Sequence, residues 1–402
     1  MSAAPGRPKQ ARTAARQGEG TPVNAPIYLD YNATTPIAPE VVEVMLSCLR
    51  QHFGNPSSAH AFGRVAAHTV ATARAQVAAL IGAQADEVVF TGCATEANNL
   101  ALLGVARAMG GSKRHLVISA IEHPAVMGPA RQLEEQGWSL TVVPVDGFGR
   151  VSPHDIAQAL RPDTALVSVM HANNEVGTIQ PIAEIARITR ERGVLLHTDA
   201  AQSAGKIPID VDSLGVDLLT LAGHKFYASK GVGALYVRAN TPIRNIGFGA
   251  DHEHGLRPGT ENVAAIAGLG VAAQLAQARL PELGAQLRAR RDQLHALLSA
   301  AIPGLILNGH PQQRLPNTLH VSFPAVSARR LLEHAGHIVA ASLGSACHSE
   351  HDAVSGVLAA MGAHAVRAAG AVRLSVGAMT SPIDVQRAAQ GLLEAWRTAT
   401  AP

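Results

Sequence analysis

The sequence predicts an α/β fold: a large domain around a mostly parallel β-sheet with helices on both faces, followed by a smaller α+β domain. From residue 86 onward, short β-branched runs alternate with helical stretches. The runs are apolar almost throughout, which is typical of strands that are covered on both faces. After Gly259 a long helical tract replaces this alternation, and 402 residues are ample for two such domains.

The strands of the large sheet are expected at residues 88–91, 115–120, 140–144, 165–170, 194–199 and 218–222. Helices are expected between them at 94–109, near 125–136 and at 181–192. Residues 231–238 (GVGALYVR) are expected to add a strand that could run antiparallel.

The helical tract covers about residues 261–301 and is expected to break near Pro281, because proline removes a backbone donor. An amphipathic helix near 382–397 closes the chain. We therefore expect a large domain over residues 27–283, whose first residues could pack on the small domain, and a small domain over 284–402. Residues 1–26 are rich in Ala, Pro, Gly, Arg and Gln and predict a disordered extension, with an organelle transit peptide as the alternative.

Composition argues against several classes of partner. The formal net charge of +3 is small for 402 residues and gives no reason to expect nucleic-acid binding, which needs a concentrated basic face. No uninterrupted apolar run reaches the roughly 18–20 residues of a membrane span. The chain has only three cysteines, a small and odd number that does not suit a disulfide framework. A reducing, cytoplasmic location is therefore expected.

A lysine stands at the end of an expected apolar strand, in the segment TLAGHKFY at 220–227. Burying an ammonium group is costly unless it is paired or neutralised, and a lysine that has condensed with an aldehyde avoids that cost. Lys225 is therefore a candidate for covalent cofactor binding. A surface lysine just beyond a strand is the alternative.

A carboxylate follows another expected strand, in VLLHTDAAQSAGK at 194–206. Asp199 stands at the carboxyl end of that strand, where ligands of open α/β sheets bind. It could hold a protonated pyridine nitrogen, which makes the ring an electron sink, and Gln202 could reach the phenolic oxygen of such a ring. The alternative for Asp199 is an N-cap of the following turn.

Two further segments could contact the same ligand. FTGCATEANN at 90–99 passes from a strand into a helix, an arrangement that presents N–H groups to a phosphate, with Thr95 adding a hydroxyl. A capping box is the alternative there. His123 stands in SAIEHPAV at 119–126, before Pro124, where an imidazole could stack on a ring and move protons. An inert histidine is the alternative.

Cys347 lies in the small, polar segment ASLGSACHS at 341–349. That setting suits an accessible thiol better than a buried structural cysteine. Zinc binding by Cys347, His348 and His351 is disfavoured, because no second pair of ligands has suitable spacing. No metal site is expected.

Taken together, these segments resemble the cysteine desulfurases and the related selenocysteine lyases, which are class V aminotransferases among the fold-type I pyridoxal 5′-phosphate enzymes. The resemblance covers about residues 27–396 and includes ordered motifs along that length. They are YLDYNATTP (28–36), FGNPSSAHAFGR (53–64), MHANNEVGTIQP (170–181), HTDAAQSAGK (197–206), GHKFYASKGVGALYVR (223–238), LRPGTEN (256–262), GSACHS (344–349) and VRLSVG (372–377).

The resemblance implies a seven-stranded sheet, pyridoxal 5′-phosphate as cofactor and a homodimer. It also implies conversion of L-cysteine to L-alanine, with the sulfur passing to an acceptor protein, as in iron–sulfur cluster assembly. The implied residue roles are a Schiff base at Lys225, ring contacts from Asp199, Gln202 and His123, phosphate contacts from Thr95, His224 and the second subunit's Thr260, carboxylate binding by Asn174 and Arg373, and persulfide formation at Cys347.

Some positions depart from the family pattern. Gly92-Cys93 replaces a Ser-Gly pair, Ala222 replaces a phosphate-binding serine, and residues 247–260 lack the usual triple glycine and glutamine. His348 and Tyr31-Asn32 are more similar to the selenocysteine lyases, and Pro124 fits neither group. Selenocysteine lyase activity is therefore the main alternative, followed by a class V transaminase, which would need no Cys347, and by a non-catalytic scaffold.

Overall fold

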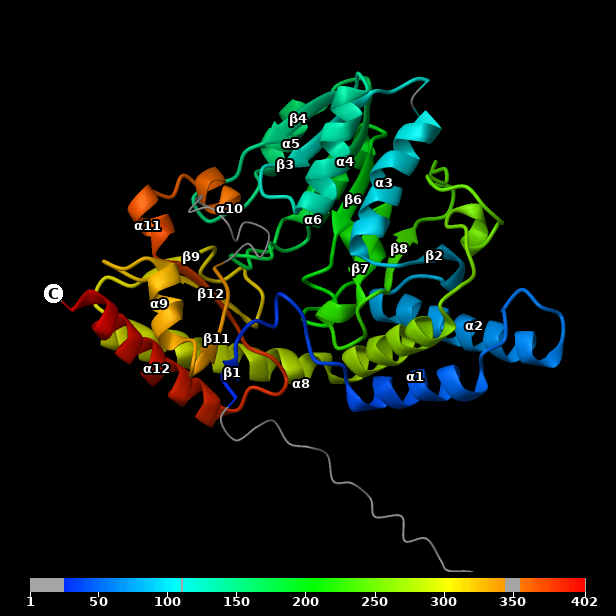
Figure 1. The fold of residues 1–402 in the computed structure, drawn as a ribbon. Helices are drawn as coiled ribbons and strands as arrows, with labels where there is room; N and C mark the ends of the chain where they lie inside the picture. The colour runs from blue at the N-terminus through cyan, green and yellow to red at the C-terminus, as the bar shows by residue number, and fades with distance from the viewer. Residues whose placement is uncertain (1–24, 110, 344–354, 402) are drawn as a thin grey trace, which may run out of the picture.

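A seven-stranded β-sheet forms the centre of the computed structural model, which describes residues 25–109, 111–343 and 355–401 (Figure 1). The strand order is β2-β8-β7-β6-β5-β3-β4, and only β8 runs against the others. The predicted fold class is confirmed, and the predicted strand limits agree within two residues. The strands are β2 (Val88–Thr91), β3 (His115–Ser119), β4 (Ser139–Val143), β5 (Thr164–Ser168), β6 (Leu195–Asp199), β7 (Leu218–Ala222) and β8 (Gly233–Val237).

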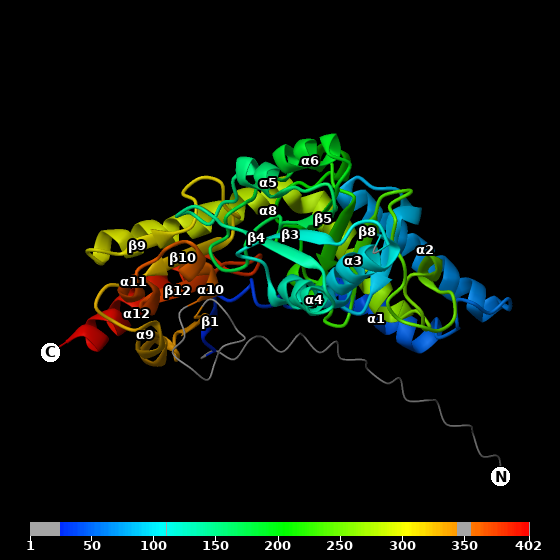
Figure 2. The same cartoon turned by 90° about the horizontal axis from the view of Figure 1, so that it is seen from above.

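Both faces of this sheet are covered by helices (Figure 2). Side chains of a strand alternate between faces, so Val117 and Val167 belong to one hydrophobic core while Leu116 and Leu166 belong to the other. The first core includes α2 (Ala61–Ile81), α5 (Pro153–Ala159) and α6 (Ile182–Glu191), and the second includes α3 (Ala94–Met109) and α4 (Pro124–Glu135). Burial on both sides explains the continuous apolar runs in the sequence.

The C-terminal part of the chain builds a second, smaller core. Its antiparallel sheet has the order β12-β10-β9, formed by β9 (Ile306–Asn308), β10 (Thr318–Ser322) and β12 (Ala371–Ser375). The N-terminal strand β1 (Ile27–Tyr28) pairs in parallel with β11 (Val339–Ala340). The remaining helices of this part are α9 (Ala328–Ala335), α10 (Gly356–Ala360), α11 (Ala365–Ala369) and α12 (Pro382–Thr400).

A single long helix, α8 (Val263–Ala301), runs beneath both parts of the molecule (Figure 1). The expected break near Pro281 is wrong, because the helix continues through that proline. Pro281 is exposed, and each half of the helix is held by a different core: Ala265–Ala276 by the large one and Leu287–Leu298 by the small one. Packing thus outweighs the lost hydrogen bond.

The length and composition of α8 would also suit a membrane span, yet its apolar side chains fill these two cores and pack on α1 (Pro39–Gln51) and α2. The expected domain boundary at residue 283 falls inside α8 and remains a prediction. One short helix, α7 (Val211–Leu214), precedes β7.

Candidate active site

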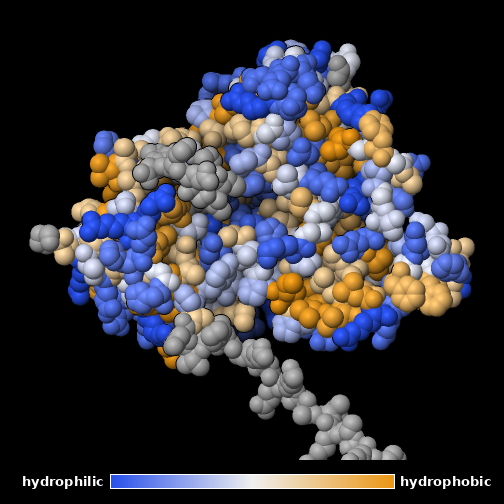
Figure 3. All heavy atoms as spheres, viewed as in Figure 1, coloured by the Kyte–Doolittle hydropathy of each residue, from blue (hydrophilic) through white to orange (hydrophobic). Residues whose placement is uncertain are grey.

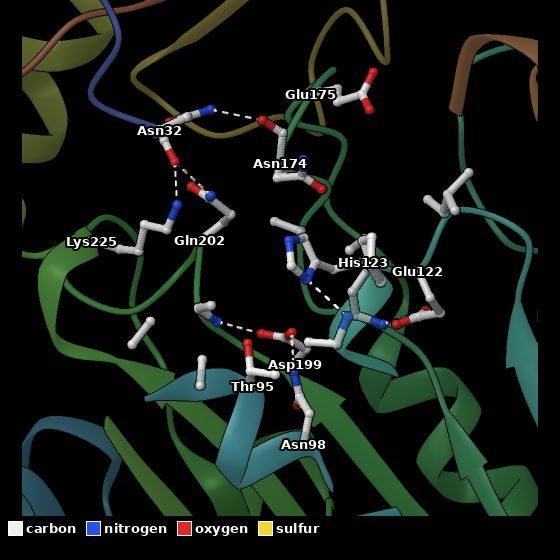
Figure 4. Close-up of a pocket in the computed structure, with 18 of the residues that line it drawn as sticks. Asn32, Thr95, Asn98, Glu122, His123, Asn174, Glu175, Asp199, Gln202 and Lys225 are labelled. Carbon is white, nitrogen blue, oxygen red and sulfur yellow. Dashed lines mark hydrogen bonds between the residues drawn. The ribbon is translucent and has the colours of Figure 1, made fainter. Parts of the chain in front are cut away.

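A cavity of 440 Å³ lies at the carboxyl ends of β3, β5, β6 and β7, and residues of the small domain close one side of it (Figure 4). Its size is in the usual range for small-molecule sites, and its position is the one expected for open α/β sheets. Eight predicted site residues line it: Thr95, His123, Asn174, Asp199, Gln202, His224, Lys225 and Arg373.

Lys225 occupies the short helical turn that directly follows β7. Its Nζ donates to the backbone oxygen of Asn32 at 2.6 Å and to that of Ala33 at 2.9 Å (Figure 4). The segment after β1 therefore holds the lysine in the cavity wall. Sequence reasoning did not identify Asn32 as a partner, because its contact is made by a main-chain oxygen.

Asp199 ends β6 and is 6% exposed. Its Oδ2 accepts a hydrogen bond of 2.7 Å from Nδ2 of Asn98, a fully buried residue of α3. Its Oδ1 accepts from the backbone N–H of Ala201 at 2.9 Å, the turn contact expected for the alternative interpretation. Both roles are compatible, since each carboxylate oxygen keeps a lone pair for a further donor.

His123 is the N-cap of α4, and Pro124 supplies the first helical residue, where a missing N–H costs little. The Nδ1 atom accepts from the backbone N–H of Ala125 at 3.1 Å, so a neutral ring carries its proton on Nε2. Burial lowers the pKa of His123, while the Asp199 carboxylate opposes that shift. The neutral imidazole is thus favoured, as proton transfer near neutral pH requires.

Glu122 is a cavity residue that sequence reasoning missed, although it stands beside His123 in SAIEHPAV. Its Oε1 accepts from Ser119 Oγ at 2.5 Å and from the backbone N–H of Met170 at 2.9 Å. Burial raises the pKa of this carboxyl group to about 8, despite both hydrogen bonds. This shift favours the protonated form of Glu122 at neutral pH.

The start of α3, which the sequence predicts to bind a phosphate, lines one end of the cavity. Cys93, Ala94 and Thr95 line it there, and the first N–H groups of a helix have no partner within the helix. His224 lines the same cavity and contacts Thr34 Oγ1 at 3.2 Å through Nδ1. Burial and nearby lysines lower the pKa of His224 to about 4, so it can serve as a neutral donor.

The small domain contributes a cation to the opposite wall. Arg373, from β12, donates to the backbone oxygen of Asn174 at 3.0 Å and pairs with Asp30 Oδ1 at 2.8 Å. These contacts fix the guanidinium beside the cavity. A planar guanidinium is well suited to a carboxylate ligand.

The remaining two predicted site residues are Thr260 and Cys347. Thr260 is exposed and does not line the cavity. Cys347 lies outside the described residues, as do His348 and His351. Gly356 and Val357, which follow that segment, do line the cavity. Within the described residues, no group of three His, Cys, Asp or Glu side chains could hold a metal ion.

A pyridoxal 5′-phosphate molecule fits this set of residues. Lys225, the buried carboxylate of Asp199 and the start of α3 line one cavity (Figure 4). They would provide an amine for the aldehyde, a partner for a ring N–H and backbone N–H groups for the phosphate. The individual roles of these residues toward the cofactor remain predictions.

Comparison with known proteins gives a consistent family. The model of the class V aminotransferases matches residues 27–388. A cysteine desulfurase IscS of Dictyoglomus turgidum is 44% identical over 360 residues, which is 89% of this chain and 91% of that protein. The IscS of Anaeromyxobacter dehalogenans is 45% identical over 90% of both chains.

Solved structures agree with this grouping. A NifS-like protein superposes with a TM-score of 0.86 at 36% identity, covering 92% of this chain and 98% of the other. SspA in complex with cysteine superposes with a TM-score of 0.78 at 35% identity, covering 87% and 98%.

Proposed function

The chain belongs to the class V aminotransferase family, among its cysteine desulfurases, and we propose that it converts L-cysteine to L-alanine with Cys347 as the first sulfur acceptor. The observation that carries this proposal is the convergence of Lys225, Asp199 and Arg373 on one cavity. Support for the substrate comes from a structural relative of 35% identity that was solved with cysteine bound.

Pyridoxal 5′-phosphate is the cofactor that these residues would hold. Lys225 would bind its aldehyde, Asp199 its ring nitrogen, Gln202 its phenolic oxygen, and Thr95, His224 and the start of α3 its phosphate. When bound, the cofactor supplies an electron-accepting ring conjugated to the α-carbon of the substrate.

The residues of the chain would orient the substrate, transfer protons and accept the sulfur. Arg373 and Asn174 orient the substrate carboxylate, and the Lys225 amine removes the α-proton. The Cys347 thiolate attacks the substrate sulfur: the new S–S bond forms while the carbon–sulfur bond breaks, and its electron pair stays with the carbon skeleton. Protonation of that carbon completes L-alanine, and His123 Nε2 can exchange the protons needed.

The decisive test replaces Cys347 by serine. Substrate binding and α-proton removal do not involve this thiol, so Cys347→Ser should still bind cysteine and change the cofactor spectrum. A hydroxyl is a poor nucleophile at neutral pH, so alanine formation should fall at least about hundredfold. Cys48→Ala, which removes a buried thiol in α1, should keep activity.

The same assay separates the alternative substrates. Alanine and sulfide or selenide are measured from L-cysteine and from L-selenocysteine in parallel. Activity of Cys347→Ser on selenocysteine alone would mean that selenide leaves without help from the thiol. Equal activity on both substrates would overturn Cys347 as the acceptor.

We further propose that the protein is a cytoplasmic homodimer and that it transfers sulfur to an acceptor protein for iron–sulfur cluster assembly. The low cysteine content supports a reducing location. The exposed position of Thr260, away from the cavity of its own chain, supports a site completed by a second copy.

A further inference from the structure

A second lysine, Lys206, lies buried behind the wall of the cavity. Only 7% of it is exposed, and its Nζ donates to Oε1 of Gln202 at 3.1 Å. In the part of the chain that the structure describes, its Nζ makes this one side-chain hydrogen bond and no ion pair. Burying a lysine amine with a single neutral partner is costly, so its position calls for a reason.

The contacts of Gln202 show what Lys206 controls. An amine donates, so the oxygen of the Gln202 amide must face Lys206. The Nε2 atom then donates to the backbone oxygen of Asn32 at 3.0 Å, an atom that can only accept. These two partners fix the amide in one of its two orientations. Gln202 lines the cavity, and the second N–H of Nε2 has no acceptor in the part of the chain that the structure describes.

The same hydrogen bonds connect the two lysines. The backbone oxygen of Asn32 accepts from both Gln202 and Lys225 (Figure 4). With the bond from Lys206 to Gln202, a continuous path runs from Lys206 through Gln202 and Asn32 to Lys225. The carbonyl and the amide polarise each other along such a path. A change at Lys206 therefore reaches the residue that would bind the cofactor.

The charged groups around Lys206 are mainly positive. Burial lowers the pKa of Lys206 well below its ordinary value, and the nearby cations Lys225 and Arg373 add to that effect. His224, the nearby titratable group on the turn after β7, has a lowered pKa as well. Charged or neutral, the Lys206 amine can still donate to Gln202, so the orientation of the amide does not depend on its charge.

We propose that Lys206 is a positioning residue: by occupying Oε1 of Gln202, it presents the remaining N–H of that amide to the phenolic oxygen of the cofactor bound at Lys225. This inference rests on the proposed cofactor. A donor at the phenolic oxygen favours the oxygen anion and weakens its hold on a shared proton, so loss of the donor raises the pH at which the bound cofactor gives up that proton.

The test is a double-mutant cycle on Lys206→Met and Gln202→Ala, read by the pH midpoint of the cofactor's visible absorbance. Each single variant should raise the midpoint by about one unit and weaken pyridoxal 5′-phosphate binding about tenfold. The double variant should show no more than either single one, because both remove one contact. Lys230→Met, which removes an exposed lysine near His224, should leave the midpoint unchanged.

A cofactor analogue without the phenolic oxygen isolates the contact. Its affinity should be the same for the wild type and for Lys206→Met. Additive midpoint shifts, an unchanged midpoint in Lys206→Met, or an equal loss of affinity for the analogue would each overturn the proposal. If Lys206→Met does not fold, Lys206→Gln replaces it, since that side chain is polar but one bond shorter than lysine.

The outcome is separable from the proposed function. A protein that shows the predicted midpoints but makes no alanine from cysteine would refute the desulfurase proposal and leave the role of Lys206 intact. Normal alanine formation with unshifted midpoints would do the reverse.

Discussion

Glu122 illustrates how a single residue can be governed by contacts that the sequence does not reveal. Its carboxyl group is buried beside Asp199, and two carboxylates so close together disfavour a second negative charge. Burial is the larger cause, and it raises the pKa of Glu122 to about 8 from an ordinary value of 4.5. The acid therefore binds a proton in the folded chain that it releases in the unfolded chain at neutral pH.

This difference predicts how stability depends on pH. A raised pKa in the folded state contributes stability below about pH 4.5, and that contribution is lost as the pH rises toward 8. Glu122→Gln has no titrating group at this position, so its stability lacks this pH dependence. The free energy of unfolding of the variant, relative to that of the wild type, should therefore rise by at least about 1 kcal/mol between pH 5 and pH 8. Denaturant titrations at pH 5, 6.5 and 8 measure this gain, and a pH-independent difference would contradict it.

At the residue scale, the sequence identified side chains whose chemistry is unusual for their local position, such as Lys225 and Asp199. It did not identify Asn98 or Lys206. Asn98 acts on a residue 101 positions away, and Lys206 acts through Gln202. Such contacts depend on how separate segments meet in three dimensions, and no local pattern encodes them.

At the scale of elements, Glu253 ties the loop after β8 to α2 by an ion pair and to the edge strand β2 by a hydrogen bond. Glu253 accepts from two nitrogens of Arg74, at 2.7 and 2.6 Å, and from the backbone N–H of Phe90 at 2.7 Å. It thereby satisfies an N–H of β2, the strand at the edge of the sheet next to β8. Glu253 and His254 have positive φ angles, a strained conformation that these contacts hold in place.

Removing one charge of this pair should destabilise the protein strongly. Side chains of Arg74 and Glu253 are 15% and 1% exposed, so Glu253→Gln leaves a largely buried cation without its partner. We expect a loss of about 3 kcal/mol in the free energy of unfolding, measured by denaturant titration. The matched change Glu134→Gln, in the exposed pair with Arg131, should cost less than about 1 kcal/mol.

A second variant checks the cause. In Arg74→Met/Glu253→Gln neither charge remains, so part of the lost stability should return relative to Glu253→Gln alone. If the double variant is less stable than the single one by the full cost of Arg74→Met, the two residues act independently and the ion pair is not the reason.

The elements whose limits the sequence predicted correctly are the buried ones. The strands β2 and β7 have the predicted limits because their residues are apolar on both faces. The long helix α8 was mispredicted at Pro281, since a sequence pattern shows the lost hydrogen bond but not the two cores that hold the halves of the helix. The loop at residues 247–260 gave no structural signal, because Glu253 within it is held by Arg74 and Phe90, which are far away in the sequence.

At the scale of the whole molecule, one surface is unusually apolar. Exposed hydrophobic residues gather on and around α1 (Figure 3), among them Leu49, which is 64% exposed, Phe53 at 70% and Phe62 at 57%. Phe53 and Phe62 stack on each other with ring centroids 5.5 Å apart. Apolar patches of this kind mark association surfaces, so we predict that this face forms the homodimer.

The dimer prediction has a direct functional test, because Thr260 would serve the cavity of the second copy. Thr260→Ala should lower cofactor affinity, and Lys225→Ala should abolish covalent cofactor binding. A dimer containing one chain of each kind has one cavity with both an intact Lys225 and an intact Thr260. Random mixing should therefore give about a quarter of wild-type activity at limiting cofactor. Under the same condition Lys225→Ala should be inactive, and Thr260→Ala should be much less active than the mixture.

Sedimentation and a surface variant complete that test. Leu49→Glu should dissociate the dimer and prevent complementation in the mixture, because a charge would be buried at the apolar contact. Ile306 lies on β9 and is 43% exposed. Ile306→Glu should leave both association and complementation intact. If the mixed chains gained no activity although they formed dimers, Thr260 would act within its own chain or not at all. If Leu49→Glu stayed dimeric, association would use another face of the molecule.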